Sequence, residues 1–296
     1  MQLQQTATSA HASSGAGTMP ATKFGNNADE NRYLQGDAEP AKPSVISTNS
    51  KFLNNPYFRD AYAQVALRRN GPDVPSTYII PMTAKAIGEV TDYAEFARLL
   101  DEEKIKNPEF GEWLRARRQT SFRSEDVAGC APGTLGHAIW GFLTGTGYEM
   151  ELKLKGVEVT NDIDYISKRR GGGHDIEHMV SGFGTNACGE LALVWSYITS
   201  IANYFTPELA HYMSSGLVFL GTTTLQRVSL HYPAAYPTVL EGLRLGVEMG
   251  QALKRPMLLE PWEDMIDWQL DDIAGHLGIA RGPGKAWDWT TEATAG

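Results

Sequence analysis

Helix start and stop signals recur along most of this chain, whereas the alternation of apolar and polar residues that marks β-strands is scarce. Asn107-Pro108-Glu109 has the order of a helix N-cap, a proline at the first helical position and an acid in the first turn. Thr206-Pro207-Glu208 repeats this order. A periodic apolar run from Met265 to Leu277 ends at Gly278, as expected of a helix C-cap. The best β-hairpin candidate, residues 149–159, is short, so the sequence predicts an all-α fold.

The first fifty residues differ in composition from the rest. They are rich in Ala, Ser, Thr, Gln, Gly and Pro, and such a segment buries too little apolar surface to offset its ordering entropy. They lack the apolar run of a signal peptide and the early arginines of a mitochondrial transit peptide. We therefore expect a disordered tail over residues 1–50, a single helical domain over 51–284, a C-terminal tail over 285–296, and a cytoplasmic location.

Charge and cysteine content narrow the classes of partner. The formal net charge is −9, which argues against nucleic acid because phosphate binding needs a basic surface. Cys130 and Cys188 lie far apart without a CxxC pattern, which indicates a reducing compartment and no disulfide framework.

One long stretch is almost free of charge. Between Glu190 and Arg227, Glu208 is the only Asp, Glu, Lys or Arg. Ser, Thr, Asn and Pro recur within it, so it does not provide the uninterrupted apolar run of about 20 residues that crosses a bilayer. We favour the interpretation that residues 191–226 form a pair of buried core helices. The alternative is that they line a tunnel for a long apolar ligand or contact a membrane.

The segment from Gly171 to Glu190 carries the clearest chemical pattern. His174 and His178 are four residues apart, so a helix would project both imidazoles from one face, as helical zinc ligands are. Asp175 would lie about 100° further round that helix and reach the same ion from the side. Either histidine alone would more often be a surface or hydrogen-bonded core residue.

Glu190 completes the pattern only if the chain turns back. On one continuous helix it would lie about 18 Å from His178. Gly182, Gly184 and Asn186 predict a turn between the two, which would place Glu190 in the first turn of a returning helix. Cys188 would then face away from Glu190 and is not expected to be a ligand.

Two imidazoles and two carboxylates suit a divalent metal ion. The predicted ligands are His174, Asp175, His178 and Glu190, with zinc as the predicted ion and manganese, iron or magnesium as alternatives. The segment lacks the HExxH arrangement, so protease chemistry is not indicated.

Two basic segments have competing interpretations. Lys168-Arg169-Arg170 either holds a substrate carboxylate or complements the macrodipole at a helix C-terminus. Residues 113–118, Trp-Leu-Arg-Ala-Arg-Arg, form a basic helix face that is solvated or, as the alternative, docks on anionic lipid.

The pattern His-Asp-x-x-His-x(11)-Glu resembles the signature of the ubiquinone-biosynthesis Coq-four family. The similarity continues through Gly184-Thr185-Asn186 and Gly189-Glu190-Leu191-Ala192. Ala131 to Gly136 is similar to the family's Pro-x-Gly-Thr-x-Gly segment, and Trp262-Glu263, Leu270 and Leu277-Gly278-Ile279 match its C-terminal helix. Together these blocks extend over roughly residues 52–281.

The resemblance implies an all-helical fold with a bound divalent metal. It implies action on a polyprenylated aromatic acid at a membrane surface: the ring carboxylate at C1 is removed and replaced by hydroxyl. His174, His178 and Glu190 would hold the ion, and Asp175 would complete the ligand set or carry a proton. Other ubiquinone-biosynthesis enzymes are the expected partners, together with a peripheral position on the inner membrane and a homodimer.

Three features depart from the family pattern: the N-terminal tail, the three glycines Gly171 to Gly173, and polar Thr222-Thr223-Thr224. They leave open a different aromatic or isoprenoid acid as substrate. A non-catalytic, lipid-binding scaffold is the alternative function. The absence of a GxGxxG fingerprint agrees with a reaction that needs no flavin or nicotinamide.

Overall fold

A computed structural model describes residues 49–69, 79–147, 150, 156 and 158–295 of the chain. Within these ranges the regular structure is helical, and β-pairing is limited to two isolated bridges, Thr134 with Gln269 and Phe183 with Gly284. The all-α prediction is confirmed. The predicted N-terminal tail and the hairpin over 149–159 fall almost wholly outside the described residues.

The described residues form α-helices, labelled α, and short 3-10 helices, labelled η. In chain order they are α2 (Lys51–Asn54), α3 (Pro56–Leu67), α4 (Ile79–Val90), α5 (Tyr93–Lys106), α6 (Pro108–Ala116), α7 (Ser124–Val127), α8 (Leu135–Thr146), α9 (Asp162–Ser181), α10 (Ala187–Tyr204), α11 (Pro207–His231), α12 (Tyr236–Ala252), η2 (Met257–Leu259), η3 (Trp262–Asp264), α13 (Leu270–Leu277), η4 (Lys285–Trp287) and α14 (Trp289–Ala293).

The predicted helix ends are largely confirmed. The Asn107 side chain accepts a hydrogen bond from the Phe110 N–H, with Pro108 opening α6. Gly278 ends α13 in the left-handed conformation, at φ 73°. Thr206 precedes α11 as predicted, but its hydroxyl donates to Glu103 Oε2 at 2.8 Å instead of capping the helix.

The helix predicted from Met265 begins later, at Leu270. Residues 266–268 bond elsewhere: the Ile266 carbonyl accepts from the Gly136 N–H at 2.7 Å, and the Trp268 carbonyl accepts from the Leu135 N–H at 2.9 Å. These carbonyls accept hydrogen bonds from N–H groups in the first turn of α8, which have no partner within the helix. These hydrogen bonds to a distant helix therefore prevent α13 from starting where the local apolar pattern predicts.

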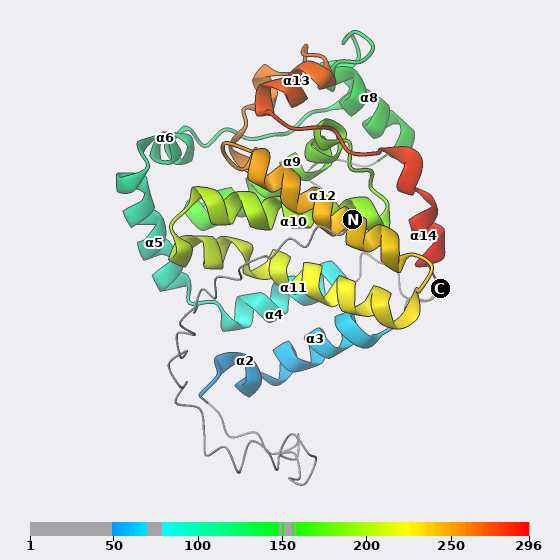
Figure 1. The fold of residues 1–296 in the computed structure, drawn as a ribbon. Coiled ribbons are helices and arrows are strands. Elements are labelled where there is room, and N and C mark those ends of the chain that lie inside the picture. The colour runs from blue at the N-terminus through cyan, green and yellow to red at the C-terminus, as the bar shows by residue number, and fades with distance from the viewer. Residues whose placement is uncertain (1–48, 70–78, 148–149, 151–155, 157, 296) are drawn as a thin grey trace, which may run out of the picture. The chain divides into compact units, whose positions relative to one another are not determined.

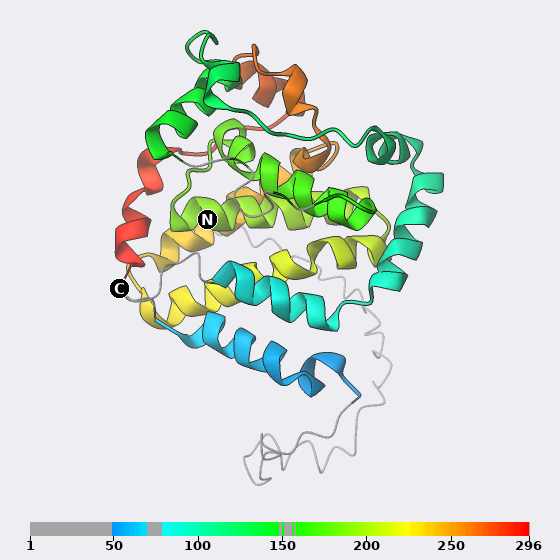
Figure 2. The same ribbon diagram turned by 180° about the vertical axis from the view of Figure 1, so that it is seen from behind.

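Helix α10 lies in the centre of the core. It packs against α12 on one side and α11 on the other, and α11 in turn contacts α3 and α4. Figure 1 shows α12, α10, α11, α4 and α3 following one another from top to bottom, and the reverse view in Figure 2 agrees. Helices α8 and α13 lie above this stack, and α14 lies along its edge.

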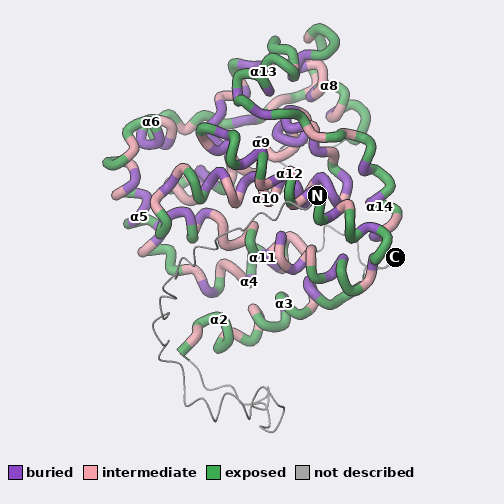
Figure 3. Tube along the Cα trace, in the orientation of Figure 1, coloured by how far each residue is buried: buried purple, intermediate pink, exposed green. Residues whose placement is uncertain are grey.

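Glycines on α12 allow its close approach to α10. A Cβ atom at Gly246 would lie 2.2 Å from the Ala192 carbonyl oxygen, and one at Gly250 would lie 2.5 Å from the Ser196 carbonyl oxygen. Helix α10 is accordingly buried or partly buried along most of its length (Figure 3). The prediction that residues 191–226 form buried core helices is confirmed by α10 and α11. No helix of the described residues is long and apolar enough to cross a bilayer.

Candidate metal centre

The predicted helix–turn–helix forms between α9 and α10. Gly182 ends α9 at φ 70°, a left-handed conformation that favours glycine, and its N–H donates to the His178 carbonyl. Asn186 caps α10 by accepting a hydrogen bond from the Gly189 N–H at 2.8 Å. A Cβ at Gly189 would meet the Gly184 carbonyl oxygen at 1.9 Å, so the tight turn requires glycine there. The turn places Glu190 in the first turn of α10, as predicted.

The C-terminal segment braces this turn. The Gly282 N–H donates to the Ser181 carbonyl at 2.7 Å, and the Gly284 N–H donates to the Gly182 carbonyl at 2.9 Å. Beyond residue 284, Asp288 accepts a hydrogen bond from the Asn186 side chain at 3.1 Å. The domain boundary at 284 stays a prediction, but the residues that follow it contact the turn.

Three side chains converge at this turn. His174 Nε2 lies 3.4 Å from Glu190 Oε2, and His178 Nε2 lies 3.4 Å from Glu190 Oε1. One ligand atom from each of the three lies within 4.8 Å of the others. The two imidazole rings stand almost perpendicular, with centroids 4.6 Å apart. Both Nε2 atoms therefore point toward the same small volume as the Glu190 carboxylate.

The outer nitrogens of both histidines have partners of their own. His178 Nδ1 lies 2.8 Å from the Phe183 carbonyl oxygen, which can only accept a hydrogen bond, so Nδ1 carries the proton. His174 Nδ1 lies 3.3 Å from Asp175 Oδ1. Partners of this kind fix the tautomer and orient the ring of a metal-bound histidine. No sequence pattern indicated the Phe183 contact, because its acceptor is a backbone atom.

The local electrostatics favour a negative Glu190 beside a cationic partner. Burial opposes ionisation of Glu190, but the hydrogen bond and the charge of the neighbouring His174 imidazole hold its pKa well below the usual range. Burial also opposes the charged form of His174, yet its contacts with Asp175 and Glu190 prevail and raise its pKa to about 10. The N-terminus of α10 adds partial positive charge near Glu190. The centre can thus hold positive charge between the rings and the carboxylate.

The residues fit a divalent ion. His178 Nε2 is buried without a hydrogen-bond partner, and its ring is set to offer a lone pair there. Two imidazole nitrogens and one carboxylate form a common ligand set for catalytic zinc and for other first-row divalent ions. His174 and Glu190 keep 37% and 45% of their side chains exposed, so a ligand can reach the centre.

Asp175 does not belong to the converging group. Its carboxylate lies beside His174 Nδ1, on the far side of that ring from Glu190. This position suits a residue that orients His174. Its predicted role as a ligand stays a prediction.

Comparisons with known proteins identify the family and the fold of this chain. The family model for Coenzyme Q (ubiquinone) biosynthesis protein Coq4 matches residues 81–283, which include the whole centre. The chain belongs to the Coq4 family. A crystal structure from Nostoc punctiforme PCC 73102, of a protein named for ubiquinone biosynthesis, matches with a TM-score of 0.56 and 24% identity, covering 76% of this chain and 98% of that one. That likeness supports the fold. No curated protein matches the sequence.

Membership of the Coq4 family confirms the resemblance inferred from the motif, and it assigns the chain to ubiquinone biosynthesis. Cys188, as predicted, points away from the centre: its thiol donates to the Thr238 carbonyl at 3.0 Å. The two basic segments have structural roles that the sequence did not reveal.

The first basic segment lies in the middle of α9, so the alternative that it complements the macrodipole at a helix C-terminus is wrong. The Arg169 guanidinium is buried and donates to Thr120, to Glu263 and to the Glu260 carbonyl. The helix continues through Gly171 to Gly173. A Cβ at Gly172 would lie 2.5 Å from the Thr120 carbonyl oxygen, which explains one of these glycines.

In the second basic segment, two arginines form ion pairs with other parts of the chain. Arg117 pairs with Asp162, at the start of α9. Arg118 pairs with Asp264 at 2.6 Å. Arg115 remains largely exposed on α6. Tertiary ion pairs thus involve two of the three arginines of this segment, and both lie beyond the end of α6.

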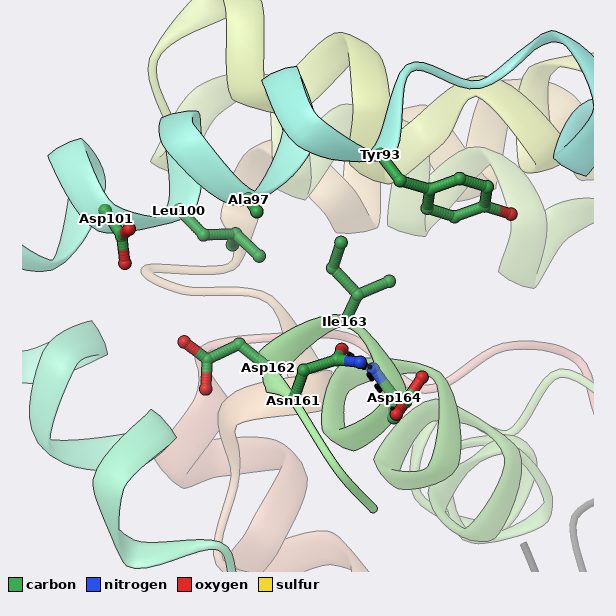
Figure 4. A pocket seen from close by; sticks show the side chains of 8 residues that line it. All are labelled: Tyr93, Ala97, Leu100, Asp101, Asn161, Asp162, Ile163 and Asp164. Atoms are coloured by element: carbon green, nitrogen blue, oxygen red, sulfur yellow. Dashed lines mark hydrogen bonds between the residues drawn. The ribbon is translucent and has the colours of Figure 1, made fainter. Parts of the chain in front are cut away.

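A separate hollow of about 420 Å³ lies between α5 and the start of α9. Its lining includes Asp101, Asp162 and Asp164 together with the apolar side chains of Tyr93 and Ile163 (Figure 4). Lys104 neutralises Asp101 and Asp162 at 2.6 and 2.9 Å. The hollow is about 24 Å along α9 from His178, so it is not part of the metal centre.

Proposed function

We propose that this chain is a metal-dependent enzyme of ubiquinone biosynthesis that removes the C1 carboxylate of a polyprenylated hydroxybenzoate and replaces it with hydroxyl. The observation that supports this proposal best is the convergence of His174 Nε2, His178 Nε2 and the Glu190 carboxylate. Three protein ligands leave coordination positions for substrate, whereas structural zinc sites are usually closed by four.

His174, His178 and Glu190 would hold the ion, which, when bound, would accept an anionic oxygen of the substrate and stabilise negative charge that develops on the ring. Asp175 would keep the His174 ring oriented through Nδ1, and the Phe183 carbonyl would do the same for His178. The hydrogen bonds that brace the turn hold these groups in fixed positions. Correct positioning contributes much of an enzyme's rate acceleration.

The overall reaction balances with two co-reactants. The bond between C1 and the carboxylate carbon breaks and CO₂ leaves, while a C1–oxygen bond forms. Dioxygen supplies the hydroxyl oxygen, its second atom leaves as water, and a two-electron donor supplies the reducing equivalents. The ion would most simply be zinc if it only stabilises charge, whereas iron or manganese would suit direct participation in oxygen chemistry.

We further propose a peripheral position on a membrane, in the company of other ubiquinone-biosynthesis enzymes. A polyprenyl chain partitions into lipid, so its aromatic head is presented at the membrane surface.

The test is CO₂ release from ring-carboxylate-labelled prenylated hydroxybenzoate, with added divalent ion, dioxygen and ascorbate. The unmodified protein should release labelled CO₂ and give the C1-hydroxylated ring. His174→Ala should lower the rate at least about a hundredfold, since loss of one ligand weakens binding of the ion and misplaces the substrate. His211→Ala, an exposed histidine on α11, is the matched control and should leave the rate unchanged.

The enzymatic proposal would be refuted if protein that binds the ion released no CO₂ from several such acids with zinc, manganese, iron or magnesium. That result would favour a lipid-binding scaffold in which the ion only braces the helix turn.

A further inference from the structure

Beside the metal centre, deeper in the core, lies a group of polar side chains with unmet hydrogen bonds. We call Arg170, Glu177, Tyr197 and Trp262 the inner polar cluster. Arg170 Nη2, both Glu177 carboxylate oxygens, the Tyr197 hydroxyl and the Trp262 indole nitrogen are all buried without a hydrogen-bond partner. A buried polar group without a hydrogen-bond partner destabilises the folded protein. Such a concentration beside a ligand-binding centre indicates partners that arrive from outside the chain.

Arg170 and its neighbour Arg169 differ in this respect. The donors of Arg169 are largely used by Thr120, Glu263 and the Glu260 carbonyl. The guanidinium of Arg170 lies over the Tyr197 ring, 4.9 Å from its centroid, and forms no ion pair within the described residues. Stacking on an aromatic ring holds the planar guanidinium in place while leaving its edge free for a planar anion.

The inner polar cluster continues the line of the metal ligands. Arg170 lies one turn before His174 on α9, a rise of about 6 Å. Tyr197 lies two turns after Glu190 on α10, a rise of about 10 Å. Because the two helices are antiparallel about the turn, Arg170 and Tyr197 meet further along the same seam that begins with His178 and Glu190.

Gly173 leaves room within this cluster. A Cβ there would lie 3.5 Å from Trp262 Nε1 and 3.6 Å from Glu177 Oε1. These are ordinary contact distances, so a methyl group would fit at Gly173 without a clash. Glu177 itself is completely buried. Glu177 interacts electrostatically with the buried Arg170, although no hydrogen bond joins them.

We propose that Arg170, held over Tyr197, binds the carboxylate of the aromatic acid whose ring lies at the metal centre. This inference rests on the proposed function and adds the residue that distinguishes an acid from its neutral analogues. Arg170 donates to the carboxylate through the guanidinium edge that the stacking on Tyr197 leaves free.

The test compares binding of a short-chain prenylated hydroxybenzoate with binding of its primary amide, by calorimetry in detergent. The unmodified protein should prefer the acid by about tenfold or more, the amount expected of a charge-assisted pair. Arg170→Met should abolish the preference and leave ion affinity unchanged. Arg115→Met, an exposed arginine on α6, is the matched control.

Arg170→Lys covers the case in which the methionine variant fails to fold: it keeps the charge but loses the planar fork, and should show a reduced preference. Unchanged preference in a folded Arg170 variant, or no preference in the unmodified protein, would overturn the inference and leave Arg170 with buried water as its only partner. CO₂ release without this preference would refute the inference alone. Preference for the acid without CO₂ release would refute only the proposed function.

Discussion

At the scale of single residues, one backbone contact determines what His178 can do. The Phe183 carbonyl accepts a hydrogen bond from the Nδ1–H of His178, so Nε2 keeps a lone pair in a buried position. His174 is different, because Asp175 and Glu190 stabilise its charged form. One imidazole is therefore ready for an ion, and the other must first lose a proton.

This difference predicts the pH dependence of ion binding. The pKa of His174 is raised to about 10, so the ring is protonated at neutral pH and an incoming ion must displace that proton. Apparent affinity should rise about tenfold per pH unit between pH 6 and 8, with about one proton released per ion. Calorimetry in buffers of different ionisation enthalpy measures that proton directly. Affinity that is flat over this range would show that His174 is not a ligand.

Single residues also show which parts of the site could be predicted from the sequence and which could not. The spacing of His174, His178 and Glu190 predicts their meeting, because helix periodicity and a glycine turn are local properties. Arg170 and Glu177 share a face of α9 with the ligands, and this seven-residue spacing was a signal that could have found them. Their burial, however, depends on Tyr197 and Trp262, which lie on other elements and which no local pattern connects to them.

At the scale of elements, the centre depends on how the turn between α9 and α10 is held. Asn186 caps α10 and also donates to Asp288, so one side chain joins the turn to the C-terminal segment. The sequence predicted the turn from its glycines but assigned residues 285–296 to a tail. Trp287 is buried and stacks on Phe183, at 6.1 Å between ring centroids.

We predict that Asn186→Ala weakens ion binding as well as stability. Loss of the cap should cost about 1 kcal/mol of the free energy of unfolding, and displacement of Glu190 should lower ion affinity about tenfold or more. Asn107→Ala is the matched control, because Asn107 caps α6 in the same way, far along the chain from the centre. It should cost similar stability and leave ion affinity unchanged. Equal ion affinity in both variants would show that the turn does not position Glu190.

The element scale also explains a helix boundary that the sequence placed wrongly. Met265 and Ile266 continue the apolar period of α13, yet the Ile266 and Trp268 carbonyls bond to the start of α8. Periodicity reports which residues are buried, but it does not report which backbone groups a distant helix requires. Caps such as Asn107 and Gly278 were predictable because their partners lie within four residues.

At the scale of the whole molecule, the packing of the core fixes the position of the turn between α9 and α10. Helix α10 is buried among its neighbours, and the approach of α12 at Gly246 fixes its position. The family model spans residues 81–283, from within α4 to Pro283, and leaves α2, α3 and α14 outside the match. The fold class and the centre could be predicted from the sequence because both follow from helix spacing. The stacking order of the helices could not, since it depends on which faces allow close approach.

The measurement that tests the central claim most directly is anomalous X-ray diffraction, at the absorption edge of the bound ion, from crystals grown with one equivalent of zinc or manganese. We predict a single peak per chain, about 2.0–2.2 Å from His174 Nε2, His178 Nε2 and the Glu190 carboxylate. A peak at Cys130 or elsewhere on the surface, with none among these three residues, would contradict the account.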